Sequence, residues 1–322
     1  MKDKTKVVTI GGGNGSATVL EALKQHRDVF DISAAVSVSD SGGSSGCLRQ
    51  EFNALPPGDI LRAVLALSVY DYKILKNIFY RERFSGAGKL DNHNLGNLFL
   101  TLAGKYAGDF VSATRALEQA VDAVGHVYPA ALEQTDLAVE LSNGEIVKGE
   151  AEIDVPKYDR SLRIQKAWLE PAGQVYSGAK EAIEQADAII FCPGSLYTSV
   201  IAALLSVGVK EAIAASKAKL IYVPGSVYEL EGETGPEKLS DFVKELQSYL
   251  PRKIDLVIHN VHALNTAEQK KYQDKKWAVF ENDKEKIPEY KVMDVEYEKP
   301  VGVFWIERLG EILRETIGDK NK

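Results

Sequence analysis

Short β-branched runs alternate along the chain with longer stretches whose apolar residues recur at helical spacing. The β-branched runs open five segments, 7–16, 33–46, 186–199, 217–226 and 254–260. Each run leads into glycine, serine or asparagine, and helical patterns separate most of the runs. Strands that alternate with helices form parallel sheets that are covered on both faces. The pattern therefore predicts an α/β fold, with a doubly wound, Rossmann-like and mostly parallel sheet.

Helical spacing also predicts the segments that cover this sheet. Helices are expected at about 17–27, 60–84, 95–102, 109–124, 198–206, 236–249 and 305–317. Two prolines and a glycine precede Asp59, so this residue is expected to cap the helix that begins at Ile60. The apolar helices between 60 and 120 could supply a homodimer face, and burial within one chain would explain them equally well.

A different pattern interrupts the parallel sheet in the middle of the chain. Apolar and polar residues alternate from 130 to 154, and Asn143-Gly144 lies between two such runs. Asn-Gly is a strong signal for a tight β-hairpin turn. An antiparallel β-hairpin insertion is therefore expected over about 130–170. The tail from about 265 to 322 is charged and poorly patterned before its last amphipathic helix, and 1–322 is expected to form a single domain.

Composition and charge exclude several classes of protein. The 322 residues are 45% hydrophobic, which is enough for a full core. A net charge of −7 and a pI near 5.5 argue against a nucleic-acid or anionic-membrane partner. Cys47 and Cys192 are far apart, so neither a disulfide framework nor a cysteine zinc site is indicated. No secretory leader or membrane-spanning run is apparent, and a cytoplasmic protein is expected.

The first candidate binding element is the glycine-rich turn after the strand VVTI. A strand that turns on glycine into a helix leaves backbone N–H groups unpaired at the positive end of the helix dipole, which suits phosphate. The dinucleotide fingerprint is incomplete, because Ser16 stands at its third glycine position. The alternative is that these glycines only form a tight turn. The residues expected to hold phosphate here are Gly11, Gly12, Gly13, Asn14 and Gly15.

Two further turns repeat this arrangement. DSGGSSG offers amides and hydroxyl groups, and PGSLYT lies between a strand and a helix. The carboxyl ends of parallel strands share one edge of a sheet, so we expect the three turns to converge on one rim and hold a diphosphate. A solvated flexible loop is the alternative for DSGGSSG. The candidate residues in these two turns are Ser41, Gly42, Gly43, Ser44, Ser45, Gly194, Ser195 and Thr198.

Charged residues near these turns are candidates for metal binding and catalysis. Asp40 or Asp59 could hold Mg²⁺, which takes oxygen ligands and bridges carboxylate to phosphate, and Asp40 could instead grip a ribose. Their structural alternatives are a hydrogen-bond clamp and a helix cap. Arg49 and Arg62 are candidate counter-charges for phosphate, or ordinary surface arginines. The segment NHNLGN adds His93, Asn94 and Asn97 as candidate ligand contacts.

Taken in order, GGGNG, DSGGSSG, PPGDI, HNLGN, PGSLYTS and GET resemble the gluconeogenesis factor (YvcK-like) family. That family lies within the superfamily of the phospholactate transferase CofD. The resemblance implies a Rossmann-like nucleotide-binding sheet, and members of the YvcK type bind nucleotide sugars such as UDP-N-acetylglucosamine. They support cell-wall synthesis, cell shape and growth on gluconeogenic carbon. Tyr272 matches a family tyrosine beside the nucleotide-sugar site.

Three hypotheses follow. The first is a non-catalytic or weakly catalytic binder of a UDP-sugar. The second is a Mg²⁺-dependent transferase like CofD, which the resemblance describes as moving a phospholactyl group from a guanosine diphosphate donor to a deazaflavin; Asp40 and Asp59 would then be catalytic. The third is an NAD-dependent oxidoreductase, which the incomplete fingerprint disfavours. The chain departs from the family pattern at Asn14, Cys47, Asn92 and Phe304-Trp305-Ile306, so the ligand's base and sugar stay open.

Overall fold

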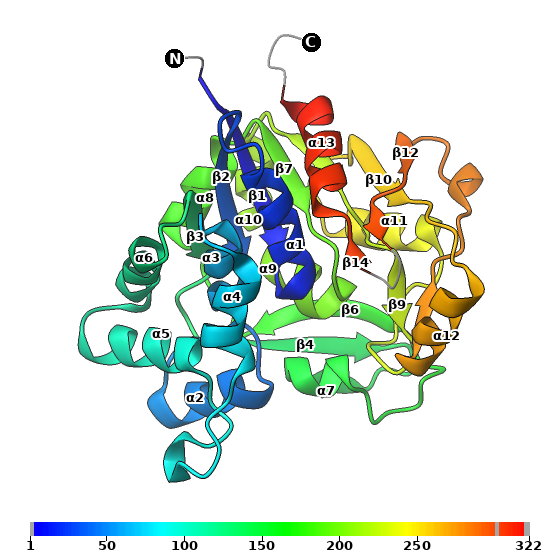
Figure 1. The fold of residues 1–322 in the computed structure, drawn as a ribbon. Coiled ribbons are helices and arrows are strands. Elements are labelled where there is room, and N and C mark those ends of the chain that lie inside the picture. Colours follow the sequence, from blue (N-terminus) through cyan, green and yellow to red (C-terminus); the bar gives the residue numbers. More distant parts are fainter. Residues whose placement is uncertain (1–2, 300–302, 319–322) are drawn as a thin grey trace.

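A central parallel sheet organises the computed structural model, which describes residues 3–299 and 303–318 (Figure 1). Within these residues the sheet has seven strands in the order β12-β10-β8-β7-β1-β2-β3, and every neighbouring pair is parallel. The strands are β1 (Thr5–Gly11), β2 (Phe30–Val36), β3 (Gly125–Pro129), β7 (Ala188–Phe191), β8 (Lys219–Tyr222), β10 (Leu256–Asn260) and β12 (Val292–Val295). The predicted doubly wound α/β fold is confirmed.

The strand order reverses between β1 and β7, which creates a crevice at their carboxyl ends. From β1 the chain proceeds to β2 and β3 on one side, and from β7 to β8, β10 and β12 on the other. Val7 pairs with Ala188 and Ile10 with Phe191, so the two strands end side by side. Ligands of open α/β sheets bind at such a reversal. The glycine-rich exits of β1 and β7 therefore meet where the fold favours a site.

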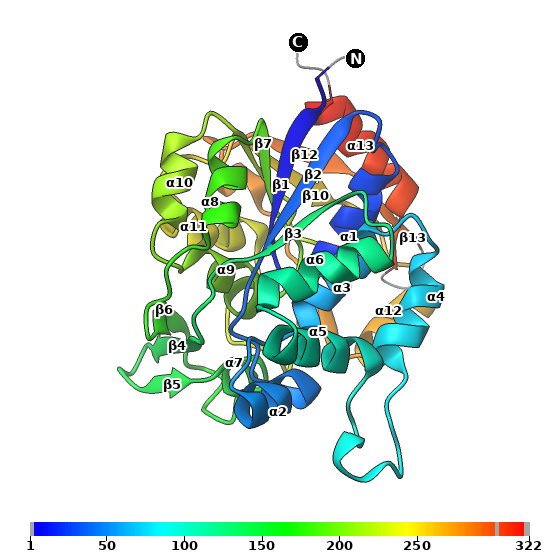
Figure 2. The same ribbon diagram turned by 90° about the vertical axis from the view of Figure 1, so that its left-hand side faces the viewer.

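Helices cover both faces of the sheet, as Figure 2 shows from the side. β1 and β7 are apolar on both faces because each face packs against a separate core cluster. One face carries α1 (Gly13–Lys24), α3 (Gly58–Leu67), α5 (Leu95–Tyr106), α6 (Phe110–Ala120) and α13 (Ile306–Ile317). The other carries α8 (Ser177–Glu184), α9 (Ala202–Leu204), α10 (Val209–Ala215) and α11 (Leu239–Ser248).

The expected antiparallel insertion is present. β4 (Asp136–Leu141) pairs with β5 (Ile146–Lys148) and with β6 (Ile164–Glu170), and Gly144 takes a φ of +84° in the turn between β4 and β5. α7 (Glu150–Asp154) follows β5. The insertion lies below the carboxyl ends of the central strands in Figure 1. Its apolar residues belong to the same core cluster as those of α8, α9, α10 and α11, so the insertion packs against the main body of the protein.

The prediction of one helix over 60–84, capped by Asp59, is wrong in two respects. It is divided into α3, α4 (Tyr72–Lys76) and the π-helix η1 (Asn77–Arg81), because Ser68 is extended and bridges to Ala123. Asp59 is not the helix cap, because Pro57 takes that position and Asp59 lies in the first turn.

Several apolar side chains of this region are exposed: Tyr70, Ile74, Ile78, Phe84, Leu90, Leu95, Leu102 and Tyr106. The predicted homodimer face stays a prediction.

The C-terminal part is more regular than its sequence indicates. β12 forms an edge of the central sheet, and β11 (Trp277–Val279) pairs antiparallel with β9 (Val227–Glu229). The remaining elements are α2 (Gly43–Phe52), η2 (Gly88–Leu90), η3 (Leu196–Ile201), α12 (Thr266–Asp274), η4 (Lys284–Lys286), β13 (Glu298–Lys299) and β14 (Val303–Phe304). The expected last helix is α13, and the end of the predicted tail, 319–322, lies outside the described residues. None of the helices described has both the length and the apolarity that a bilayer crossing requires.

Candidate functional site

A cavity of about 780 Å³ lies at the strand-order reversal. Its walls come from the exits of β1, β7 and β8, from α7 of the insertion, and from the segment around β9. The structure brings these sequence-predicted residues together in its lining: Gly12, Gly13, Asn14, Gly15, Asp40, Asp59, Gly194, Ser195, Thr198 and Tyr272. Other predicted residues lie outside the lining: Gly11, Ser41, Gly42, Gly43, Ser44, Ser45, Arg49, His93, Asn94 and Asn97.

The first glycine turn presents an uncapped helix N-terminus to the cavity. Gly12 precedes α1 in an extended conformation, and no side chain caps the helix. No acidic residue lies in the first turn of α1. Gly13 has a φ of +69°, which favours glycine. The N–H groups at this end of α1 therefore have no side-chain acceptor within the helix cap, and the phosphate-binding role predicted for them stays a prediction.

Close approach explains two glycines of this turn. A Cβ on Gly12 would lie 2.2 Å from Asp59 Oδ2, so the Asp59 carboxylate is directly against the turn. A Cβ on Gly15 would lie 1.9 Å from the carbonyl oxygen of Pro193, in the exit of β7. Because Gly15 lacks a side chain, the start of α1 can pack onto the backbone at the exit of β7. The chain segments that follow β1 and β7 are therefore in direct contact.

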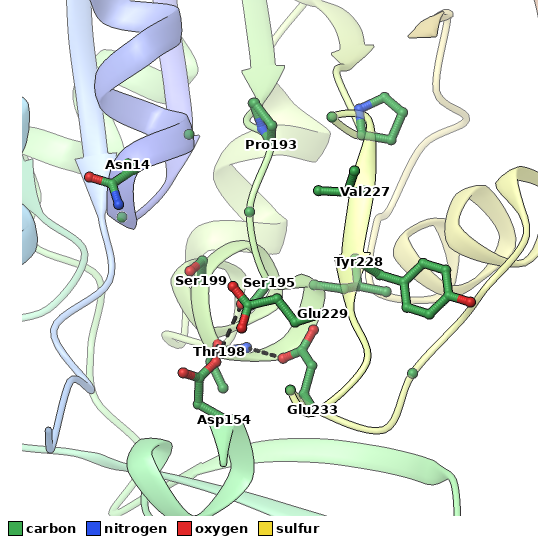
Figure 3. Close-up of a pocket in the computed structure, with 18 of the residues that line it drawn as sticks. Asn14, Asp154, Pro193, Ser195, Thr198, Ser199, Val227, Tyr228, Glu229 and Glu233 are labelled. Carbon is green, nitrogen blue, oxygen red and sulfur yellow. Dashed lines mark hydrogen bonds between the residues drawn. The ribbon is translucent and has the colours of Figure 1, made fainter. Parts of the chain in front are cut away.

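The third turn, PGSLYT, is occupied by the protein's own acids (Figure 3). The Glu233 carboxylate accepts hydrogen bonds from the backbone N–H groups of Tyr197 and Thr198, each at 3.1 Å. Asp154 Oδ1 accepts from the hydroxyl groups of Ser195 and Thr198, each at 3.4 Å. The N–H groups that the sequence predicts to bind phosphate therefore donate their hydrogen bonds to Glu233. An anion could reach them only after Glu233 moves.

The second turn, DSGGSSG, bends away from the cavity after Asp40. Gly42 N–H donates to Asp40 Oδ1 at 2.9 Å, and Ser41 N–H donates to Glu150 Oε2 at 3.4 Å. Ser44 Oγ bonds His93 Nδ1 at 2.9 Å, where both side chains are buried. The physical reason is that α2 begins at once, at Gly43, and packs on α5. The loop contributes Asp40 to the lining but does not form a second open phosphate seat.

The HNLGN segment belongs to the same buried cluster as Ser44. Asn97 Nδ2 donates to Ser44 Oγ at 3.1 Å, and the Asn94 side chain caps α5 by accepting from Asn97 N–H at 2.7 Å. His93, Asn94 and Asn97 are all buried. His93 and Asn97 therefore join α5 to Ser44 of α2, Asn94 caps α5, and none of the three residues lines the cavity.

Of the two arginines expected to supply positive charge, only Arg62 lines the cavity. Arg49 bonds the Thr135 carbonyl at 3.0 Å and pairs with Asp136 at 2.8 Å, so it joins α2 to the insertion and does not line the cavity. Arg62 does line the cavity, paired with Asp59. Lys76 also lines it, and its Nζ donates to Asn14 Oδ1 at 3.2 Å. Lys76 is not among the residues predicted from the sequence, because α4 was expected to be the middle of one long buried helix.

Several acids surround the same space. Burial raises the pKa of Asp40, and the nearby charge of Asp59 raises it further. Burial raises the pKa of Glu150 to about 8, with a further contribution from Asp40. Burial also raises the pKa of Asp154 and brings that of Glu233 to about 7. These acids are therefore harder to ionise than free carboxylic acids. A bound cation would lower their pKa values and favour the ionised forms.

A divalent cation fits only part of this wall. Within 3–299 and 303–318, no three His, Cys, Asp or Glu side chains are grouped closely enough to hold a metal ion. Asp40 and Asp59 repel each other electrostatically beside the uncapped turn of α1. Mg²⁺ commonly takes one or two protein carboxylates and completes its shell with phosphate oxygens and water. These two acids could therefore hold Mg²⁺ together with a bound diphosphate.

The far side of the cavity is aromatic and hydrogen-bonded. Tyr272 is buried, packs edge-on against Trp277 with ring centres 5.7 Å apart, and donates its hydroxyl to Glu298. Asn260 Nδ2 donates to Glu298 at 2.9 Å and to Ser226 Oγ at 2.8 Å. Tyr272, Trp277 and Glu298 all line the cavity. The family resemblance indicates Tyr272 but not its partners Trp277 and Glu298, which lie in the poorly patterned tail.

A partly buried acid on α1 predicts a pH-dependent stability. Burial raises the pKa of Glu21 from 4.5 to about 7, against the opposing effect of Lys24. The folded state therefore keeps a proton that the unfolded state releases, and stability should fall as the pH rises between these values. We expect Glu21→Gln to be more stable than wild type at about pH 8 and about equal to it near pH 4 in urea unfolding. The exposed Glu51→Gln is the control; an equal gain at both pH values would contradict the expectation.

The chain resembles known proteins over most of its length. A family model described as 2-phospho-L-lactate transferase CofD matches residues 7–299. A Thermotoga maritima protein provisionally named gluconeogenesis factor is 40% identical over 282 residues, covering 88% of this chain and 87% of that protein. The gluconeogenesis factor of Bacillus subtilis is 36% identical, covering 85% and 84%. A crystal structure of a UPF0052 family member from Bacillus halodurans has a TM-score of 0.88 and 29% identity, covering 97% and 99%.

Proposed function

Because this chain belongs to the CofD family and to its gluconeogenesis factors, we propose that it binds a nucleotide diphosphate, specifically a UDP-sugar, in the cavity at the strand-order reversal. The observation that carries this proposal is the uncapped N-terminus of α1, which opens into a cavity with an aromatic wall. Its volume of about 780 Å³ lies in the usual range for small-molecule sites. The protein would act in the cytoplasm and couple this metabolite to envelope growth, cell shape and gluconeogenic growth.

The parts of the cavity match the parts of such a ligand. The amides after Gly12, with Lys76 and Arg62 nearby, supply donors and positive charge for the diphosphate. Other carboxylates of the cavity lining, such as those of Glu150 and Asp154, would accept hydrogen bonds from sugar hydroxyl groups. Trp277 and Tyr272 offer apolar ring surface to the base or the sugar. This distribution supports a ligand with an anionic centre and two uncharged ends.

The pair Asp40 and Asp59 supports a second candidate, a Mg²⁺-dependent transferase of phosphorus-containing groups. In phosphoryl transfer, positioning and electrostatic stabilisation can supply most of the catalysis without a nucleophile in the protein. Asp40 and Asp59 would hold the metal, and the amides of α1 would orient the diphosphate. In this case the donor is a guanosine diphosphate derivative and the acceptor a deazaflavin. Release of guanosine monophosphate on mixing these two compounds with the protein would favour this candidate.

Calorimetry with UDP-N-acetylglucosamine and Mg²⁺ tests the first proposal. We expect saturable binding, and Lys76→Gln should weaken it about tenfold because a charged partner of the diphosphate is lost. Lys73→Gln is the matched control, since Lys73 is exposed on the same helix and does not line the cavity. No heat at millimolar ligand would refute the UDP-sugar proposal. Equal weakening by both variants would refute the specific role of Lys76.

A further inference from the structure

The loop between β9 and α11 places a carboxylate where a ligand anion would bind. Glu233 receives the N–H groups of Tyr197 and Thr198 at the start of the continuous helical segment formed by η3 and α9. Figure 3 shows Glu233, Glu229 and Asp154 turned toward Ser195 and Thr198. Glu233, Ser195 and Thr198 all line the cavity. The carboxylate therefore lies between the cavity and the helix that the sequence predicts as an anion seat.

The loop itself is fixed by contacts that do not involve the Glu233 side chain. Arg160 donates to the Gly232 carbonyl at 2.9 Å, and Tyr158 Oη bonds Thr234 Oγ1 at 3.0 Å. Arg163 donates to the Gly235 carbonyl. These contacts attach the loop to the segment that connects α7 to β6. Glu233 could consequently leave the amides by rotation of its side chain and local movement of one residue, with the loop still attached.

The charges around Glu233 favour its departure. Besides burial, the charge of Asp154 on α7 raises the pKa of Glu233, while hydrogen bonds from backbone N–H groups at the start of η3 lower it. Burial raises the pKa of Glu233 to about 7 despite its hydrogen bonds to the amides. The ionised form of the Glu233 side chain is therefore less favourable here than it would be in water. A diphosphate, which stays ionised near neutral pH, is a stronger acceptor for the same N–H groups.

We propose that Glu233 is an internal substitute for an anionic group of the ligand, and that a nucleotide diphosphate must displace it from the amides of Tyr197 and Thr198. The proposal rests on the proposed function, because it concerns the same cavity. The displaced carboxylate moves toward solvent, and the loop 230–236 loses its attachment to η3. Glu233 therefore lowers affinity in the free protein, and ligand binding removes the contact of this loop with η3 while its contacts with the segment between α7 and β6 remain.

Replacement of Glu233 tests this mechanism. We expect Glu233→Ala to bind UDP-N-acetylglucosamine roughly three- to tenfold more tightly than wild type, because a competing acceptor is gone. Glu233→Gln keeps the shape but not the charge, and its affinity should lie between the two. Glu231→Gln is the matched control: Glu231 is exposed on the same loop and does not line the cavity. If Glu233 is a permanent structural cap, both Glu233 variants will bind equally or more weakly, which would overturn the proposal.

A second measurement separates this proposal from the identity of the ligand. If no variant binds the UDP-sugar, pyrophosphate without added divalent cation replaces it as the probe. Tighter pyrophosphate binding by Glu233→Ala than by wild type would support displacement even though the proposed ligand had failed. Equal binding would overturn it. In wild type, hydrogen exchange of the amides in 230–236 should become faster with bound ligand; slower exchange would mean that the loop tightens, contrary to the proposal.

Discussion

Replacing Gly15 with alanine is expected to lower the free energy of unfolding by about 3 kcal/mol and to remove nucleotide binding. The added Cβ would lie 1.9 Å from the carbonyl oxygen of Pro193 and 2.5 Å from its carbonyl carbon. The position of a Cβ is fixed by its own backbone, and the atoms that it meets are backbone atoms, so a rotamer change cannot relieve the contact. Cys192 N–H is bonded to the Ile10 carbonyl at 3.0 Å, which holds the exit of β7 against β1. The start of α1 must therefore move away from β7, and the two glycine exits separate.

Urea unfolding and calorimetry of the same preparations check this expectation. Gly108→Ala is the matched control, because its Cβ would make an ordinary contact of 3.4 Å with the Ser112 side chain, far from the cavity. Its stability should stay within about 0.5 kcal/mol of wild type. If Gly15→Ala were as stable as the control and still bound the nucleotide, the close packing of α1 on the exit of β7 would not be needed for the site.

The fold could be predicted where the signal is local. Central strands such as β1 and β7 are buried on both faces, so they appear in the sequence as continuous apolar runs that lead into glycine. The edge strands β3 and β12 were missed for the opposite reason. β3 contains His126 and Pro129, and all four residues of β12 are only partly buried. An edge strand needs fewer apolar residues, so its pattern is weak.

The glycine turn of the site could be predicted from the sequence, as could lining side chains such as Asp40 and Asp59, but not the contacts that these side chains make. The glycines of the first turn are next to each other in sequence, and the geometry that they impose is local. Glu233 comes 36 residues after Tyr197, and Asp154 comes 44 before Thr198, so their meeting depends on the tertiary fold. The orientation of DSGGSSG likewise depends on where α2 packs. Residue type indicated which groups could bind phosphate, and packing decided which of them face the cavity.

Asp40→Asn is expected to change stability and ligand binding in opposite directions. The pKa of Asp40 is raised by burial and by the charge of Asp59, so the ionised side chain destabilises the free protein. Asparagine keeps the shape and the oxygen that accepts from Gly42 N–H at 2.9 Å, and it removes the charge. The free energy of unfolding should therefore rise by about 1 kcal/mol in the presence of a chelator.

The same substitution should remove most of the effect of Mg²⁺ on binding. If Asp40 and Asp59 hold the metal against the diphosphate, loss of one carboxylate should weaken Mg²⁺-dependent binding by about tenfold or more, while binding without metal should be unchanged or tighter. Calorimetry with and without Mg²⁺ measures both quantities, and Asp31→Asn, exposed on β2, is the control. Unchanged Mg²⁺ dependence would remove Asp40 as a metal ligand. Because a purely structural acid would lower stability and binding together when replaced, the opposite signs distinguish a metal ligand from a hydrogen-bond clamp.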